Sequence, residues 1–283
     1  MLAQLEYHRT DAKMFTMKRG RTHYPAGRIL THGRRVQQRR RWCGGFLSET
    51  APSCRGTTRL PRAPLLVAMH AGASPMWESM WTAGIGRGEK FDVGGPSATL
   101  TSALSSMGAP EPDMTALVPG CGRAYDALAL AQHGYKKVVA VDLSATACEA
   151  ARRELQSCGA AAAGRIEVLC ADFFTLEGTY DLIWDCTFLC ALDPSVRERW
   201  ATQSRSLLSE RGTLLTCVFP IAENVVGGPP YALSVPLLRG LLEPAGLQSS
   251  SVREDLSEAE QHRPGGMAAP FPDTALAAWR LAE

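Results

Sequence analysis

The sequence lacks several features that would place it in a simple class. No stretch approaches the roughly 18 consecutive apolar residues of a membrane-spanning helix, so we expect no membrane partner. None of the 9 cysteines forms a Cys-x-x-Cys pair, and their spacing resembles neither a secreted disulfide scaffold nor a zinc site. We therefore expect reduced thiols, most of them buried as small apolar groups, and no metal ion.

Acidic residues are scarce at one end of the chain. Residues 1–70 hold 3 Asp/Glu against 14 Lys/Arg, whereas residues 71–283 hold 25 Asp/Glu against 16 Lys/Arg. The formal net charge of +2 is thus a cancellation between two unlike parts. We predict a basic, disordered leader over 1–70 and a single domain over 71–283, which is long enough to bury one substantial core.

Three interpretations of the leader remain open. It is rich in Arg and poor in acids, as organelle transit peptides are, and it has no apolar core of a secretory signal. Alternatively, the leader is an upstream extension of the reading frame, with Met69 or Met76 as the working start. It is otherwise a tail whose Lys/Arg clusters bind the phosphates of a nucleic acid. The last is weakest, because no aromatic residues interleave with the arginine clusters of the leader. The acidic remainder offers no electrostatic case for a nucleic-acid substrate either. We expect a cytoplasmic protein, or a chloroplast or mitochondrial one if the leader is a transit peptide.

Strand-like and helix-like segments alternate through the remainder. The expected strands are 115–118, 137–141, 165–170, 180–184, 213–219, 247–252 and 275–281. The expected helices are 126–132, one capped by Ser144 and ending near Gly159, one from Asp193-Pro194 to Gly212, and 234–242. This alternation predicts an α/β fold with a mostly parallel sheet and helices on both faces.

Polar or glycine-rich groups follow the first strands, where ligands of such sheets bind. Gly120 and Gly122 lie in a tight strand-to-helix turn, in which a Cβ would block close approach. Asp142 ends the second strand, 20 residues after Gly122, as an acid that accepts from ribose hydroxyls does. NAD and S-adenosylmethionine both use such an acid. Tyr125 stands where a dinucleotide motif needs its third glycine, which disfavours NAD.

The next two strand ends carry further candidates. Asp172 and Phe173 can hold an adenine by its amino group and its face, although Phe173 or its neighbour Phe174 can equally be core. Asp185 follows the fourth strand, above the expected reaction centre. Direct contact with a ligand and a cap for the turn near Thr187 are equally good interpretations of Asp185.

Several segments together carry a family resemblance. They read M-W-E-S-M-W (76–81), F-D-V-G-G-P-S (91–97), A-L-V-P-G-C-G-R-A-Y-D (116–126), V-D-L-S (141–144), A-D-F-F (171–174), Y-D-L-I-W-D-C-T-F-L-C-A-L-D-P (180–194), and F-P-I with G-G-P-P-Y-A-L-S-V (219–235). Over about residues 76–281 the chain resembles the thiopurine S-methyltransferase family, most closely its thiol, thiocyanate and halide methyltransferase branch.

The resemblance implies a Rossmann-like class I methyltransferase that uses S-adenosylmethionine. Its cofactor contacts carry over to Trp77, Trp81, Gly120, Asp142, Asp172 and Phe173, with Phe91 where relatives often have Trp. Two positions depart from the family pattern. Ala124 replaces a glycine of the loop, and Cys186 stands where the halide and thiol branch often has Tyr. If Cys186 contacts the cofactor through its backbone the change is harmless; otherwise it alters substrate preference.

Two aromatic features have competing interpretations. Trp77 and Trp81 are four residues apart and share a face if helical, either as core packing or as a flap whose rings suit a sulfonium cation. The loop 227–231 is interpreted as a rigid substrate-side loop with Tyr231 as a wall or hydrogen-bonding group. A turn with a packed Tyr is the alternative.

The implied reaction is an in-line displacement at a sulfonium by a small soft nucleophile. A thiolate, thiocyanate, bisulfide or halide ion needs alignment and desolvation rather than a strong base. His133 and His262 lie outside every motif, which argues against histidine-based catalysis. We expect a monomer acting on a small or anionic substrate. The alternatives are an NAD-dependent oxidoreductase and a non-catalytic binding protein on a methyltransferase fold.

Overall fold

The computed structural model describes residues 73–222, 227–267, 269 and 271–283. Contacts divide the chain into two units, Met1–Pro61 and Arg62–Glu283, and every described residue belongs to the second. The basic leader, with its three interpretations, therefore lies outside the described residues. Within them, no helix has the length and apolar character needed to cross a membrane.

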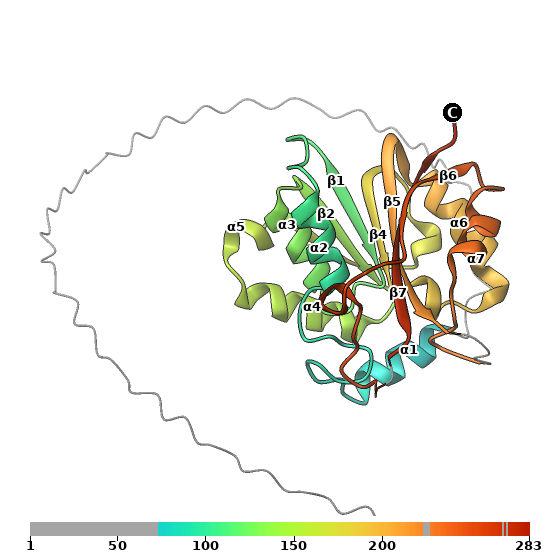
Figure 1. Cartoon of the computed structure of the whole chain (residues 1–283). Helices are drawn as coiled ribbons and strands as arrows, with labels where there is room; N and C mark the ends of the chain where they lie inside the picture. Colours follow the sequence, from blue (N-terminus) through green and yellow to red (C-terminus); the bar gives the residue numbers. More distant parts are fainter. Residues whose placement is uncertain (1–72, 223–226, 268, 270) are drawn as a thin grey trace, which may run out of the picture. The chain divides into compact units, whose positions relative to one another are not determined.

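The described residues form a seven-stranded, mostly parallel sheet, which confirms the predicted fold class (Figure 1). Its order is β3-β2-β1-β4-β5-β7-β6, and β7 runs antiparallel to both of its neighbours. The strands are β1 (Thr115–Pro119), β2 (Lys137–Asp142), β3 (Ile166–Cys170), β4 (Tyr180–Cys186), β5 (Leu208–Ile221), β6 (Leu247–Arg253) and β7 (Asp273–Leu281). The strand order reverses between β1 and β4, where such sheets bind ligands.

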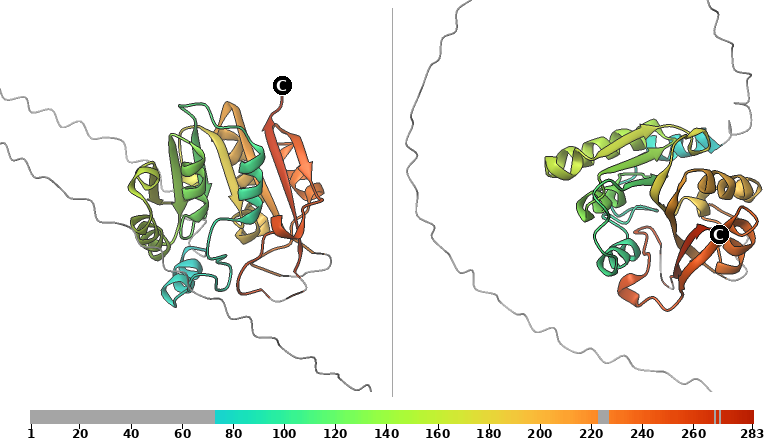
Figure 2. Two further views of the ribbon diagram at one scale, coloured as in Figure 1. Left: turned by 60° about the vertical axis from the view of Figure 1, so that its left-hand side comes forward. Right: turned by 90° about the horizontal axis from the view of Figure 1, so that it is seen from above.

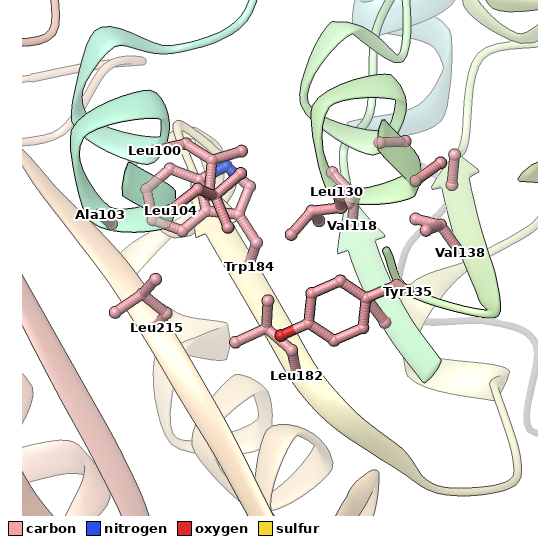
Figure 3. Close-up of a cluster of buried hydrophobic side chains, with 14 of the residues drawn as sticks. Leu100, Ala103, Leu104, Val118, Leu130, Tyr135, Val138, Leu182, Trp184 and Leu215 are labelled. Atoms are coloured by element: carbon pink, nitrogen blue, oxygen red, sulfur yellow. The ribbon is translucent and has the colours of Figure 1, made fainter. Parts of the chain in front are cut away.

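Helices cover both faces of the sheet (Figure 2). One face carries α2 (Ala98–Ser106), α3 (Tyr125–His133) and α4 (Ala145–Ser157), and the other carries α6 (Arg197–Ser206) and α7 (Val235–Leu242). Successive residues of a strand point to opposite faces, so Leu117 joins the second core while Ala116 and Val118 join the first. In the first core, Leu100 of α2 and Leu130 of α3 lie with the sheet residue Trp184 (Figure 3).

The structure corrects one helix prediction. The helix expected to end at Gly212 comprises a short 3-10 turn, Pro194–Val196, and α6, which ends at Ser206. Gly212 lies instead inside β5, where the register against β4 shifts. A Cβ there would lie 2.8 Å from the carbonyl oxygen of Tyr180, so this glycine permits close strand contact rather than ending a helix.

Three helices lie where the sequence predicted none or only a conditional one. They are α1 (Ala73–Thr82), α2 and α5 (Ala160–Ala163). Of these, the sequence indicates only α1, through the four-residue spacing of Trp77 and Trp81. In α2 the buried side chains include Thr99 and Ala103 beside Leu100 and Leu104, so its apolar stripe is weak in composition. Packing on the sheet stabilises this helix more than its local pattern does.

Candidate active site

The loop after β1 is shaped by two glycines in the left-handed region. Gly120 has φ +60° and Gly122 has φ +51°. A Cβ on Gly120 would lie 2.8 Å from Cδ2 of Phe188, and one on Gly122 would lie 3.4 Å from Cζ2 of Trp81. Both the conformation and the close approach therefore require glycine, and the loop is held between two aromatic rings.

Asp142, at the end of β2, holds this loop in place by hydrogen bonds. Its Oδ2 accepts from the backbone N–H of Gly122 (3.0 Å) and its Oδ1 from that of Ser144 (2.9 Å). Burial raises the pKa of its carboxyl, and the two backbone donors partly oppose that shift. A carboxylate has about four acceptor positions, so Asp142 keeps capacity to accept from a hydroxyl of a bound ligand.

Ala124 adopts the backbone conformation that a glycine would favour. Its φ is 62° and its ψ is 26°, a left-handed conformation directly before α3, and its side chain is buried. A non-glycine residue pays about 1–2 kcal/mol for this conformation. The replacement of the family's glycine therefore leaves the left-handed turn in place at a modest energetic cost.

An aromatic cluster from α1 and the following loop packs beside the glycine turn. Phe91 makes edge contacts with Trp77 (centroids 5.7 Å apart, 78°) and Trp81 (5.8 Å, 68°). Trp81 is buried, and the guanidinium of Arg123 lies 5.7 Å from its ring centroid. Trp81 and Phe91 line the pocket described below, whereas Trp77 supports Phe91 from its half-buried position.

Asp92 organises the loop that carries Phe91, a role that sequence reasoning missed. Its Oδ1 accepts from the backbone N–H groups of Gly88 (2.8 Å) and Gly94 (2.7 Å), and its Oδ2 pairs with Nε of Arg123 (3.2 Å). The residue stands in the quoted segment F-D-V-G-G-P-S, so a signal was present. Aspartate before a pair of glycines is typical of turns in which the side chain bonds nearby backbone groups.

Glu78 docks α1 onto the start of α4. Its Oε2 accepts from Oγ of Ser144 (2.6 Å) and its Oε1 from Oγ1 of Thr146 (2.6 Å). These hydrogen bonds lower the pKa of Glu78 to about 2. Ser144 also accepts from the backbone N–H of Ala147, which confirms it as the N-cap of α4. The flap is thereby tied to the helix that begins beside Asp142.

Removing the Glu78 carboxylate should loosen the flap. In Glu78→Ala we expect roughly tenfold or faster amide hydrogen exchange over α1, with exchange inside α4 unchanged, because α1 then depends on the packing of its aromatic side chains alone. The pKa of Glu78 is lower in the folded state than its ordinary value of 4.5. The stability that its carboxylate contributes is therefore fully present above pH 4.5 and is lost as the pH falls through about 2. Glu89→Ala, in the next loop, is the control. Unaltered exchange over α1 in Glu78→Ala would refute this docking role.

The ends of β3 and β4 are more deeply packed than the glycine loop. Oδ1 of Asp172 accepts from the backbone N–H of Phe174 (2.9 Å) and caps a short 3-10 turn. Phe173 is buried against Phe174 (centroids 5.4 Å apart) and Phe188 (5.1 Å). The ring of Phe173 therefore belongs to the core, and the half-buried Asp172 is the polar group at this edge.

Asp185 points into the second core. It is 2% exposed, its Oδ1 accepts from the backbone N–H of Leu189 (3.1 Å), and its Oδ2 accepts from Nε1 of Trp200 (2.9 Å). Burial raises its pKa to about 6. Asp185 is not among the residues that line the pocket. This geometry favours the turn-capping interpretation over direct ligand contact.

Tyr231 lies beside a buried arginine on the β4–β5 side. Its backbone N–H donates to the carbonyl oxygen of Cys190 (2.7 Å), and a Cβ on Gly228 would lie 2.5 Å from its ring. The guanidinium of Arg197 is 5.8 Å from the ring centroid. Arg197 is 8% exposed, burial lowers its pKa, and its Nε has no hydrogen-bond partner in the described part of the chain. Sequence reasoning did not single out Arg197.

A pocket joins the glycine loop to the end of β4. Its lining includes Trp81, Phe91, Gly120, Gly122, Cys186 and His262. A wider hollow between α4, α5 and β3 lies elsewhere, and its lining contains no carboxylate or imidazole. The pocket opens at the β1–β4 reversal of the sheet, so we take it as the candidate site.

His262 and the thiol of Cys186 meet at one wall of this pocket. Nδ1 of His262 lies 3.6 Å from Sγ of Cys186 and 3.4 Å from Oγ of Ser97. Cys217, opposite Cys186 on β5, completes a group whose donor atoms lie within 4.8 Å of one another. Sequence reasoning placed His262 outside any motif, because no local pattern links it to β4 or β5.

The cysteine prediction holds in one respect and fails in another. All seven cysteines of the described residues are free, but only Cys148, Cys190 and Cys217 are buried. The prediction that most thiols are buried is therefore wrong for this part of the chain. Cys121 and Cys186 keep partial exposure because they line the pocket.

Comparison with known proteins gives one consistent group of relatives. The sequence model of the family described as thiopurine S-methyltransferase matches residues 73–274. A probable thiol methyltransferase 2 of Arabidopsis thaliana is 37% identical over 186 residues, which cover 65% of this chain and 78% of that protein. A thiocyanate methyltransferase 1 of Brassica oleracea is 33% identical over 181 residues, which cover 63% of this chain and 76% of that protein.

Solved structures agree at the level of the fold. A glycopeptide N-methyltransferase complexed with S-adenosyl-L-methionine superposes with a TM-score of 0.52 at 14% identity, covering 66% of this chain and 95% of its own. A second structure is described as the conversion of a disulfide bond into a thioacetal group during echinomycin biosynthesis. It superposes with a TM-score of 0.56 at 21% sequence identity, covering 74% of this chain and 93% of its own. At these identities the likeness establishes the class I methyltransferase fold.

Proposed function

Because the chain belongs to the thiopurine S-methyltransferase family and is an S-adenosylmethionine-dependent methyltransferase, we propose that it methylates a small soft nucleophile: a thiol, thiocyanate, bisulfide or halide. One observation carries this proposal. The pocket at the β1–β4 reversal runs from the glycine loop to a wall that contains a thiol and an imidazole. Soft, weakly hydrated groups at this wall suit a polarisable acceptor.

The residues at the strand ends fit the cofactor. The left-handed glycines hold the loop in a tight turn between Phe188 and Trp81, and Asp142 retains acceptor capacity beside them. We propose that Asp142 and Asp172 hold the adenosyl portion, with Phe173 supporting that edge from the core. Trp81 and Phe91 then cover the pocket, braced by Trp77. When bound, the sulfonium supplies the methyl group for an in-line displacement.

The chain contributes alignment and exclusion of water. In this proposal the aromatic cluster of α1 closes over the reactants, which strengthens local electrostatic effects and fixes the line of attack. Asp185 is a positioning residue, since it anchors the turn after β4 that carries Cys186 and Thr187. Thr187 has φ +61°, a strained conformation that the surrounding structure must hold.

Tyr231 and Arg197 do not line the pocket, and we propose them as groups that attract an anionic acceptor from outside it. A buried guanidinium whose Nε lacks a partner in the described residues gains energy from a nearby anion. This local positive charge offsets the acidic character of residues 71–283, which would otherwise repel an anionic acceptor. We also keep the proposal that residues 1–70 are a leader, which the mass of the native N-terminus would test.

Calorimetry followed by product analysis tests the function. We expect heat of binding with S-adenosylmethionine and none with NAD, whereas the opposite result would favour the oxidoreductase alternative. Methyl thiocyanate, methyl iodide and methanethiol should then be sought as products from thiocyanate, iodide and bisulfide. Cofactor binding without turnover of any acceptor would favour a non-catalytic binding protein.

A further inference from the structure

The imidazole of His262 is built into the pocket wall from a distant part of the chain. It is 3% exposed, its ring packs edge-on against Phe219 (centroids 4.9 Å apart), and its backbone N–H donates to Oγ1 of Thr274 (3.2 Å). These contacts fix the position of the ring but do not give both of its nitrogens a hydrogen-bond partner. Nε2 is buried and has no hydrogen-bond partner among the described residues, which is unusual for a purely structural histidine.

Nδ1 is the nitrogen that faces pocket-lining groups. Its neighbours are Oγ of Ser97 at 3.4 Å and Sγ of Cys186 at 3.6 Å, and both residues line the pocket. The contact with Ser97 is longer than the roughly 2.7–3.2 Å of an ordinary hydrogen bond. The Cys186 contact is a sulfur hydrogen bond, so a group that enters the pocket and brings a proton reaches Nδ1 by replacing the Cys186 thiol there.

The other titratable groups of this pocket are poorly suited to accept a proton. Asp92 and Asp126 already accept from N–H donors on their carboxylate oxygens. Burial raises the pKa of Tyr125, and the neighbouring Cys217 thiol together with burial raises the pKa of Cys186 well above its usual value, so both are proton donors at neutral pH. Among these lining groups the imidazole of His262 is left as the base.

The groups around His262 shift the pKa of its imidazole in opposite directions, and the net shift is upward. Burial and Arg263 lower the pKa of His262, whereas the Asp126 carboxyl raises it. Cys217 faces the same group from β5. A general base is most efficient when its pKa lies close to the operating pH.

We propose that His262 is the general base that removes the proton of a neutral thiol acceptor, while anionic acceptors such as thiocyanate react without it. This inference rests on the proposed function. Alkyl thiols, with a pKa of about 8.5 or above, are mostly protonated at pH 7. The proposed site would therefore serve two acceptor classes, of which one needs proton removal.

The step balances as follows for a thiol acceptor. The S–H bond breaks, its proton goes to Nδ1 of His262 and its electron pair stays on the acceptor sulfur. That sulfur forms a bond to the methyl carbon as the sulfonium carbon–sulfur bond breaks, with its electrons passing to the leaving thioether sulfur. The imidazolium then releases its proton to solvent. Thiocyanate undergoes the same displacement with no proton to transfer.

The test compares two acceptors in the full-length chain. In His262→Gln we expect kcat/KM for 2-mercaptoethanol at pH 7 to fall roughly 100-fold or more, within the 10²–10⁴ range of general base catalysis. The value for thiocyanate should change less than about threefold. The thiol defect should shrink as pH rises toward the pKa of the thiol, because the thiolate needs no base. His133→Gln, at the exposed end of α3, is the matched control and should leave both rates unchanged.

Other outcomes would overturn the proposal. Equal losses for both acceptors would assign His262 a structural role, and no loss for the thiol would remove it from the reaction. A wild-type protein that methylates neither acceptor would overturn the proposed function and this inference with it. If His262→Gln fails to fold, nuclear magnetic resonance of labelled histidine in the wild type decides. We expect the His262 imidazole to titrate at a higher pH than a free histidine does, and a ring that stays in one protonation state would refute the proposal.

Discussion

Replacing Asp142 with alanine should weaken the binding of S-adenosylmethionine by roughly 10- to 150-fold, as measured by isothermal titration calorimetry. Hydrogen bonds to a charged group contribute roughly 1.5–3 kcal/mol, which corresponds to that range of Kd. In the protein itself, Asp142 accepts from the backbone N–H groups of Gly122 and Ser144. The substitution therefore removes the proposed ligand contact and also the two hydrogen bonds that hold the glycine loop.

Two variants separate these contributions. Asp142→Asn keeps one acceptor oxygen and should bind more tightly than Asp142→Ala. Asp181→Ala is the matched control. Asp181 also accepts from a backbone N–H, that of Thr115 (2.8 Å), but it lies at the amino-terminal ends of the strands, away from the glycine loop. It should leave the cofactor affinity unchanged. An affinity unchanged in Asp142→Ala would contradict the role assigned to Asp142.

Replacing Asp185 with alanine should lower the free energy of unfolding by roughly 2–5 kcal/mol. The substitution leaves two buried donors, Nε1 of Trp200 and the backbone N–H of Leu189, without their acceptor, at about 1–3 kcal/mol each. Urea unfolding with a common m-value measures the change. Asp193→Ala, which removes an exposed cap of the neighbouring 3-10 turn, is the control and should cost far less. A loss below about 1 kcal/mol would show that water replaces the carboxylate.

The elevated pKa of Asp185 adds a pH dependence. Its folded pKa of about 6 lies above the ordinary value of 3.8, so the folded state binds the proton more tightly than the unfolded state. The stability contributed by this group is complete below pH 3.8 and is lost as pH rises through about 6. The deficit of Asp185→Asn, which does not titrate, should therefore be larger at pH 4 than at pH 7. The reverse order would contradict the burial of this carboxyl.

Local pattern was sufficient for most of the sheet. The predicted strands lie within β1 to β7 or overlap them closely, because buried parallel strands are short apolar runs with polar or glycine ends. The exception is the region from α6 to β5. In the sequence, a glycine that ends a helix looks the same as a glycine inside an irregular strand. At Gly212 the close contact with the carbonyl oxygen of Tyr180 identifies the second case.

The candidate site was recoverable in part for a similar reason. Gly120, Gly122 and Asp142 lie in strand-end motifs, and β1 and β2 are neighbours in the sheet. Their proximity thus follows from the chain order of one βαβ unit. The orientation of Asp185 did not follow, because the predicted strand ended at 184. β4 continues to Cys186, so Asp185 points to the same face as Ile183 of the second core. Its role in ligand contact remains a prediction that the turn-capping geometry does not favour.

The sequence by itself determined the class of protein: an α/β domain whose strand ends carry a glycine turn and an acid, with segments that match one methyltransferase family. Such features are encoded locally, by periodicity and by residue types with special backbone properties. The tertiary structure alone decided that His262 meets Cys186 and Ser97, and that Glu78 meets Ser144. Each of these pairs joins residues at least 66 positions apart. No local spacing encodes such a contact, because it depends on how the packed core brings separate elements to one edge of the sheet.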